Sequence, residues 1–270
     1  MLPDKSQQDF VLPLSFWGTK VDVQVQTLLD ARHMRYYFQD YLLRSEGRTP
    51  SAIKVELVAP NGPYVAAEPG ERALRVKTAK SNDWVLVGEN DPSPIPPFTY
   101  DGLRTRFRTF HGSCIAPPHR PDRGLVIHGQ STAGKSTLLL HLLDRGWTFV
   151  ADDTCVVASD GGIVPYTRPI GVRDVASKSI PLVEKARGKG ISFATRTGTT
   201  RAIHVRDLSL SPSKGPVLWT WTAELVRSPH FTVDQVSPQS WRVSLDVDAH
   251  AISAVTALED LCGLGRDGAS

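Results

Sequence analysis

The chain has 270 residues, of which 40% are hydrophobic and 22% charged, so its composition is that of a globular protein and excludes an intrinsically disordered one. The formal net charge of +3 is small, and no Lys/Arg run reaches five residues, which argues against nucleic acid as a partner. This length accommodates one large or two ordinary domains.

Cysteine usage and hydropathy predict a protein of the cytoplasm. Cys114, Cys155 and Cys262 are far apart and form no CxxC pair, which is typical of reduced structural thiols. The first residues lack the basic segment and apolar run of a signal peptide. No apolar stretch approaches the roughly 18 residues that span a bilayer, so no membrane association is expected.

The first hundred residues read as a mixed α+β unit. Alternating valines at 21, 23 and 25 predict a strand, and residues Thr27–Ser45 predict a helix that stops before Gly47. Aromatic side chains on this helix are expected to pack against the sheet, with a substrate-contacting surface as the alternative; they are Tyr36, Tyr37, Phe38 and Tyr41. Further strands are expected at Ile53–Val58, Ala73–Lys77 and Trp84–Val87.

Four prolines within Asp91–Pro97 indicate a stiff linker, and we place the domain boundary there. Residues 1–97 would form a smaller α+β domain that could recognise the substrate. Residues 98–270 would form the catalytic domain.

The second part begins with a strand at Leu103–Phe110 that leads into His111-Gly112. Strand Gly124–His128, a glycine-rich segment, helix Ser136–Arg145 and strand Trp147–Ala151 then follow in order. This strand–loop–helix–strand unit is typical of a nucleotide-binding α/β core. Residues Val217–Asp248 are expected to supply further core strands, and Ala249–Leu264 a last helix.

The strongest motif is G-x-x-x-x-G-K-S, which in this setting predicts a phosphate-binding loop (P-loop, or Walker A motif). Glycines let successive backbone N–H groups turn toward an oxyanion, and the following helix adds its positive N-terminal end. Lys135 is expected to reach the β- and γ-phosphates, and the Ser136 hydroxyl to bind Mg²⁺. The predicted nucleotide-binding residues are Gly129, Gln130, Ser131, Thr132, Ala133, Gly134, Lys135, Ser136 and Thr137.

A pair of carboxylates, Asp152-Asp153, follows the next strand only 17 and 18 residues after Lys135. One could hold Mg²⁺ while the other accepts a proton from a substrate hydroxyl, because neighbouring residues at a strand end point in different directions. The alternative is that one of them only caps a turn. Many P-loop ATPases and GTPases place their acidic strand much farther along the chain.

These residues resemble the catalytic domain of HPr kinase/phosphorylase. That family combines a glycine-rich phosphate loop, one helix ending in Arg-Gly, and a strand ending in Ala-Asp-Asp, which here are Gly129–Ser136, Arg145-Gly146 and Ala151–Asp153. A His-Gly pair ahead of the loop strand matches His111-Gly112. The resemblance covers residues 105 to 175 and does not extend to the first hundred.

The resemblance implies an α/β fold related to phosphoenolpyruvate carboxykinase. Members of the family often assemble as hexamers, so the resemblance also implies that this chain could form a homo-oligomer. It implies that Asp153 accepts the proton and Asp152 supports it, with Ser136 and Asp152 at the metal and His111 near the phosphates. A histidine that is only hydrogen-bonded within a turn is the alternative for His111.

Two features of the family are missing. Its metal-binding Glu after the Asp pair has no counterpart in Pro165–Arg173, where Arg168 and Arg173 are candidates for stabilising phosphate charge, unless they are merely solvated. Its Pro-Gly-Arg-Asn phosphorolysis signature is also absent. The chain is therefore more similar to the diverged serine kinases of lasso-peptide biosynthesis.

The sequence thus predicts an ATP- and Mg²⁺-dependent kinase that phosphorylates a hydroxyl, most simply a serine, of a peptide, protein or small metabolite. Two alternatives stay open. One is a regulatory module that binds nucleotide without transfer and closes the glycine-containing segment Lys185–Thr200 over it. The other is a carboxykinase-like enzyme that acts on an organic acid.

Overall fold

The computed structural model describes residues 10–44, 51–78, 81–86, 107–173, 180–195 and 198–263. Its contacts divide the chain into two compact units: Met1–Phe98 with Ile191–Thr199, and Thr99–Gly190 with Thr200–Ser270. The proline segment in which we placed the domain boundary lies outside the described residues, as does the tail after residue 263.

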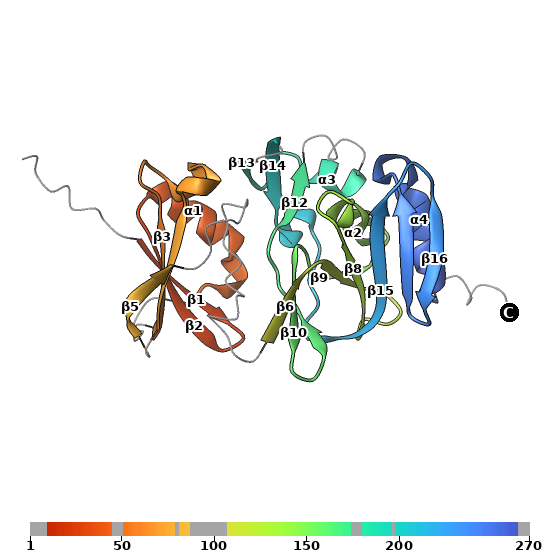
Figure 1. The fold of residues 1–270 in the computed structure, drawn as a ribbon, viewed down its shortest axis with the longest axis horizontal. Coiled ribbons are helices and arrows are strands. Elements are labelled where there is room, and N and C mark those ends of the chain that lie inside the picture. Colours follow the sequence, from red (N-terminus) through yellow and green to blue (C-terminus); the bar gives the residue numbers. More distant parts are fainter. Residues whose placement is uncertain are drawn as a thin grey trace, which may run out of the picture. The chain divides into compact units, whose positions relative to one another are not determined.

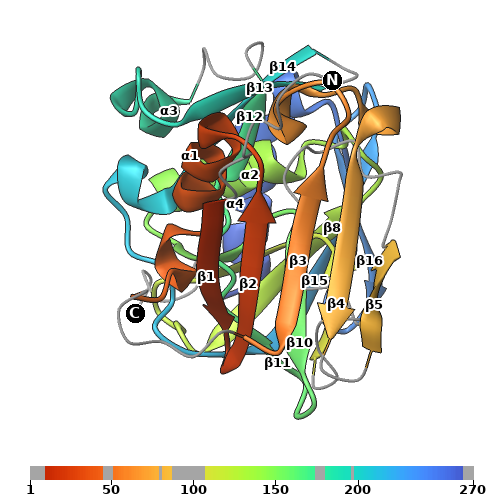
Figure 2. The same cartoon turned by 90° about the vertical axis from the view of Figure 1, so that its left-hand side faces the viewer.

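The first unit is built on a five-stranded sheet in sequential order, β1 to β5. Strands β2 and β3 are parallel, joined through helix α1 (Leu28–Tyr37), and the other neighbours are antiparallel (Figures 1 and 2). The strands are β1 (Phe10–Phe16), β2 (Thr19–Val25), β3 (Ile53–Val58), β4 (Ala73–Thr78) and β5 (Ser81–Leu86). Short 3-10 turns η1 (Gln39–Tyr41), η2 (Tyr64–Ala66) and η3 (Pro69–Glu71), and strand β13 (Ile191–Thr195), complete this unit.

The helix predicted over Thr27–Ser45 is wrong in length, because α1 ends at Tyr37. Phe38 is fully buried and packs edge-on against Phe16 with the ring centroids 5.7 Å apart, which turns the chain inward. The backbone N–H of Leu43 then donates to the carbonyl of Pro13 at 2.9 Å, so the chain continues beside β1. Packing of one aromatic ring therefore overrides a sequence that contains no helix breaker.

The second unit holds a nine-stranded sheet with the central order β6-β10-β11-β15-β8-β7-β9, and β17 and β16 follow on from β15. Its strands are β6 (Phe107–His111), β7 (Ser113–Ala116), β8 (Arg123–Gly129), β9 (Thr148–Ala151), β10 (Thr154–Ala158), β11 (Gly162–Val164), β15 (Val217–Arg227), β16 (Thr232–Ser237) and β17 (Ser240–Leu245). Strand β12 (Ile170–Arg173) pairs separately with β14 (Gly198–Ile203). The helices are α2 (Lys135–Asp144), α3 (Pro181–Lys185) and α4 (Val247–Leu261), with a 3-10 turn η6 at Val205–Leu208.

Three strands of this sheet, β8, β15 and β17, run parallel to one another. Their carboxyl ends therefore lie at one edge of the sheet, which is the edge where open α/β sheets bind their ligands. The glycine-rich segment leaves the end of β8 at this edge and leads into α2. The mixed α/β arrangement thus presents the predicted phosphate-binding residues at the edge where a ligand is expected.

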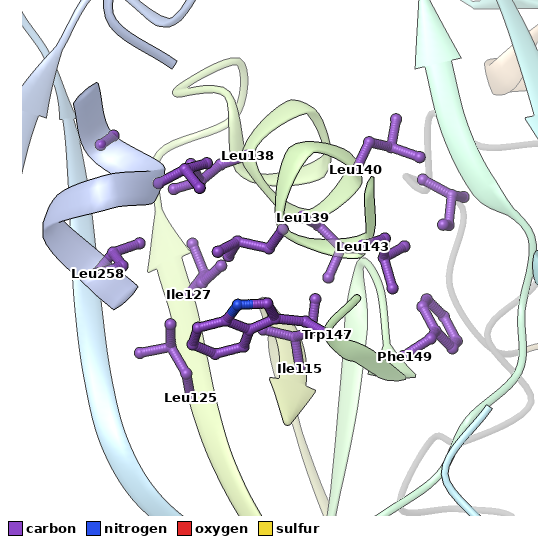
Figure 3. Close-up of a cluster of buried hydrophobic side chains, with 14 of the residues drawn as sticks. Ile115, Leu125, Ile127, Leu138, Leu139, Leu140, Leu143, Trp147, Phe149 and Leu258 are labelled. Carbon is purple, nitrogen blue, oxygen red and sulfur yellow. The ribbon is translucent and has the colours of Figure 1, made fainter. Parts of the chain in front are cut away.

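Helix α2 is held by a core of apolar side chains. Leu138, Leu139 and Leu143 are buried, and the indole of Trp147 lies beneath the helix beside Ile115 (Figure 3). Helix α4 packs on the same cluster through Leu258 and its neighbours. The rigid position of α2 fixes the first residues of that helix, which are Lys135 and Ser136.

Several predicted bounds differ from the structure by a few residues. The last helix begins at Val247 rather than Ala249 because the Asp246 side chain caps it, accepting from the N–H of Asp248. Trp221 and Trp241 are buried, whereas Trp219 is 42% exposed and stacks on Phe110. Among the described helices, none combines the length and the apolar character that crossing a membrane requires.

Replacing Leu139 by Ala is expected to destabilise the second unit by about 2–5 kcal/mol, because a fully buried side chain beneath α2 would leave a cavity. The measurement is urea denaturation followed by tryptophan fluorescence. The matched control is Ile252→Ala on α4, where the side chain is 56% exposed and the change should cost far less. Equal losses for the two variants would contradict the assigned core.

Candidate functional site

The glycine loop, defined as Gly129–Gly134, joins β8 to α2 with an unusual backbone. Gly129, Thr132 and Gly134 all have positive φ angles, of 139°, 71° and 97°. The Thr132 value lies in the left-handed region that non-glycine residues seldom adopt. Gln130, Ser131 and Thr132 are exposed, so the tip of the loop is open to solvent. This alternation of backbone conformations is the kind that turns N–H groups toward an anion.

Glycine is required at positions 129 and 134 by the neighbouring atoms as well as by the positive φ angles. A Cβ at Gly129 would collide with the carbonyl oxygen of Leu225 on β15. A Cβ at Gly134 would lie 2.7 Å from the side chain of Val247, the first residue of α4. The loop is therefore pressed against β15 and α4 at its two ends, and its course is fixed by these contacts.

The ammonium group of Lys135 lies inside the curve of the glycine loop. It donates to the carbonyl oxygens of Gly129 and Gln130, at 3.0 Å each. Burial lowers the pKa of Lys135, and the nearby carboxylates of Asp152 and Asp153 oppose that change. The cation thus lies between the loop and the acidic pair, where an added phosphate could take over the two carbonyl contacts.

Asp152 is buried, with 1% of its surface exposed, and two serines hold its carboxylate. Ser113 donates to Oδ1 at 2.6 Å, and Ser136 donates to Oδ2 at 2.9 Å. Burial raises the pKa of Asp152, with a smaller contribution from the Asp153 carboxylate, while the two serine hydrogen bonds act in the opposite direction. Asp152 is therefore a fixed group that touches the first turn of α2.

Sequence reasoning missed Ser113. Its signal is present in retrospect, because β7 pairs with both β8 and β9 and therefore lies between the glycine loop and the Asp pair. A buried hydroxyl on that strand faces whatever polar group ends β9. The order of the strands supplies this placement, and a single sequence does not state it.

Asp153 differs from Asp152 in its exposure, its backbone conformation and its contacts. Its side chain is 54% exposed, and its backbone is left-handed with φ 64°. His111 Nδ1 donates to the Asp153 carbonyl at 2.9 Å and lies 3.3 Å from its Oδ1. Because a carbonyl oxygen only accepts, the proton of a neutral His111 is on Nδ1. The exposed carboxylate is thus accessible to a substrate while its backbone is held in place.

Arg168 reaches Asp153 from the segment between β11 and β12. The N–H of Tyr166 donates to Val150 O at 2.8 Å, which lays this segment along β9. Arg168 is only 2% exposed, and its Nη1 lies 3.7 Å from Asp153 Oδ2 and 3.2 Å from the Thr154 hydroxyl. The predicted arginine therefore contacts Asp153 directly.

The remaining predicted residues are placed less centrally. Arg173 ends β12 and is exposed, and in the described part of the chain no hydrogen bond or ion pair joins it to Asp152 or Asp153. Thr137 is half-buried in the first turn of α2, and Ala133 is buried behind the glycine loop. The structure thus brings together His111, the loop, the Asp pair and Arg168, and leaves Arg173 outside this group.

The donor set fits Mg²⁺ bound together with a nucleotide. Across the residues that the structure describes, no group of three His, Cys, Asp or Glu side chains is arranged to hold a metal. Mg²⁺, however, commonly uses one or two protein oxygens and completes its shell with phosphates and water. The Ser136 hydroxyl and the Asp152 carboxylate, in direct contact, offer such a pair.

Changing Asp152 to Asn is expected to stabilise the folded protein at pH 7–8. A carboxyl group whose pKa is raised on folding contributes stability below its unfolded value of 3.8, and that stability is lost as pH rises through the folded value. The neutral amide avoids this loss. Thermal unfolding should show a Tm higher by about 2–4 °C for each kcal/mol gained, with the difference shrinking toward pH 4.

The control is Asp122→Asn, in which an exposed carboxylate with its side chain outside the site is neutralised. Its Tm should follow that of the unaltered chain at every pH. A lower Tm for the Asp152 variant at pH 8 would mean that attraction to Lys135 outweighs the cost of burying the charge.

Comparisons with known proteins return one distant structural match among others. The structure is similar to that of the Hpr(Ser) kinase/phosphatase from Coxiella burnetii, with 16% identity and a TM-score of 0.34, and the match covers 60% of this chain and 99% of the other. No family model and no curated protein sequence matches the chain. A likeness this distant assigns no family, and the function has to come from the site itself.

Proposed function

We propose that the chain is a phosphotransferase that moves the γ-phosphate of ATP, bound with Mg²⁺, to a hydroxyl group of a peptide, protein or small metabolite. The observation that carries this proposal is the pairing of a lysine-containing glycine loop with two adjacent carboxylates in different environments. Asp152 is buried against Ser136, whereas Asp153 is exposed. In this proposal, the buried carboxylate would hold the metal beside the phosphates, and the exposed one would serve the substrate.

In the proposed complex, the glycine loop and Lys135 hold the phosphates. The N–H groups of the loop and the N-terminal end of α2 complement their negative charge. Lys135 exchanges its carbonyl contacts for phosphate oxygens. Ser136 and Asp152 would hold Mg²⁺, which neutralises phosphate charge when bound.

In the transfer step, Asp153 accepts the proton of the substrate hydroxyl. The acceptor hydroxyl gives its proton to the Asp153 carboxylate while its oxygen forms a bond to the γ-phosphorus. The bond from that phosphorus to the β-phosphate oxygen breaks, and ADP leaves. An exposed carboxylate suits this task because the acceptor arrives from solvent.

His111 and Arg168 position the carboxylate of Asp153, which accepts the proton. His111 fixes the Asp153 backbone through its carbonyl, and Arg168 lies beside Oδ2. Because Arg168 is buried, its position is set by the fold, and its charge also lies close to the transferred phosphate. This placement leaves Asp153 with one side toward the protein and one toward the substrate.

Asp153→Asn should lower phosphate transfer by about 10²–10⁴-fold, the usual contribution of a positioned base, and change the Kd for ATP only slightly. The measurement combines transfer of labelled γ-phosphate to a panel of serine peptides and hydroxylated metabolites with calorimetric ATP binding. Lys135→Ala should instead weaken ATP binding. The exposed Asp144→Asn is the control and should change neither quantity.

The same assay separates the alternatives. ATP binding with neither hydrolysis nor a labelled product would favour a regulatory module. Hydrolysis without a labelled product on any hydroxyl would contradict the kinase, and transfer that Asp153→Asn leaves intact would contradict the role of Asp153.

A further inference from the structure

Two segments lie on the side of the glycine loop that is away from the acidic pair. Strand β8 has β7 on one side, with β9 and Asp152 beyond it, and β15 on the other, with β17 beyond that. The segments are Ser228–Phe231, which follows β15, and Asp246–His250, which follows β17 and begins α4. Both leave the carboxyl ends of strands parallel to β8.

Contacts join these two segments to each other and to the glycine loop. The N–H of Ser228 donates to the carbonyl of Leu245 at 3.0 Å. The rings of Phe231 and His250 lie 6.0 Å apart, inclined at 33°. Val247 packs so closely on Gly134 that no Cβ would fit between them. The carboxyl edge of the sheet is thus continuous from the glycine loop to the aromatic pair.

We propose that Phe231 and His250 form the subsite for the base of the bound nucleotide, and that this base is a purine. The inference rests on the proposed function. If the terminal phosphate faces Asp153, the other end of the triphosphate points toward β15 and β17. A nucleoside that continues in this direction reaches the Phe231–His250 pair, at the sheet edge where α/β folds bind ligands.

The two rings have the properties that such a subsite needs. Phe231 is half-buried and packs against the core, so the ring is held in place. The N–H of Asp246 donates to His250 Nδ1 at 3.2 Å, so the proton of the neutral ring is on Nε2. Among the described residues, none accepts a hydrogen bond from that Nε2. The pair therefore offers an aromatic surface for stacking and one N–H donor for a purine ring nitrogen.

The test measures Kd of the full chain, with Mg²⁺, for ATP, UTP and inorganic tripolyphosphate, which has the phosphates without a base. ATP should bind about tenfold or more tightly than tripolyphosphate, because stacking a base on aromatic rings favours binding by such factors, and UTP should fall between. Phe231→Ala should remove most of the preference for ATP and leave tripolyphosphate binding unchanged. Phe231→Leu, which keeps the packing against the core, should give the same loss.

Trp219→Ala is the matched control, since it removes an exposed aromatic ring from the beginning of β15 and should leave all three affinities unchanged. Equal binding of ATP and tripolyphosphate would overturn the base subsite and leave the phosphotransferase proposal standing. Equal weakening of both ligands by Phe231→Leu would also overturn it. Failure of every triphosphate to bind would overturn both proposals.

Discussion

The buried carboxylate of Asp152 is the constraint on which the rest of the site depends. A charge with 1% exposure is tolerated only where hydrogen bonds compensate for lost water, and Ser113 and Ser136 supply them. These two bonds join β7, the end of β9 and the first turn of α2. Because Lys135 is the residue before Ser136, the same contact sets where the cation lies. A side chain at position 152 that accepts no hydrogen bond would lose both contacts and so disconnect these three elements.

Much of this arrangement could be predicted from the sequence. The spacing from Gly129 to Ser136, followed one helix later by two aspartates, specifies a strand, a turn, a helix and a second strand, and these elements are present with small changes at their ends. Such local patterns carry their own physical explanation, namely φ angles that favour glycine and an apolar helix face. The different environments of Asp152 and Asp153 also follow from their place at a strand end.

What could not be predicted depends on contacts between distant segments. Ser113 contacts Asp152 only because β7 is inserted between β8 and β9, an order that no local pattern encodes. Arg168 and Arg173 look equivalent in sequence, and the pairing of Tyr166 along β9 places one beside Asp153 while the other ends β12. The early end of α1 likewise follows from the packing of the buried Phe38 ring against Phe16 on β1.

The left-handed backbone of Asp153 has a consequence for how this fold can change. At φ 64° most side chains are strained, and the residues that tolerate this conformation are glycine, asparagine and aspartate. Two of these three have no carboxylate. A single substitution could therefore remove the proposed proton acceptor while the strand, the His111 contact to the carbonyl and the glycine loop stay as they are. In terms of the proposed function, a descendant of this chain could lose phosphate transfer and keep nucleotide binding, which is a short route from an enzyme to a sensor.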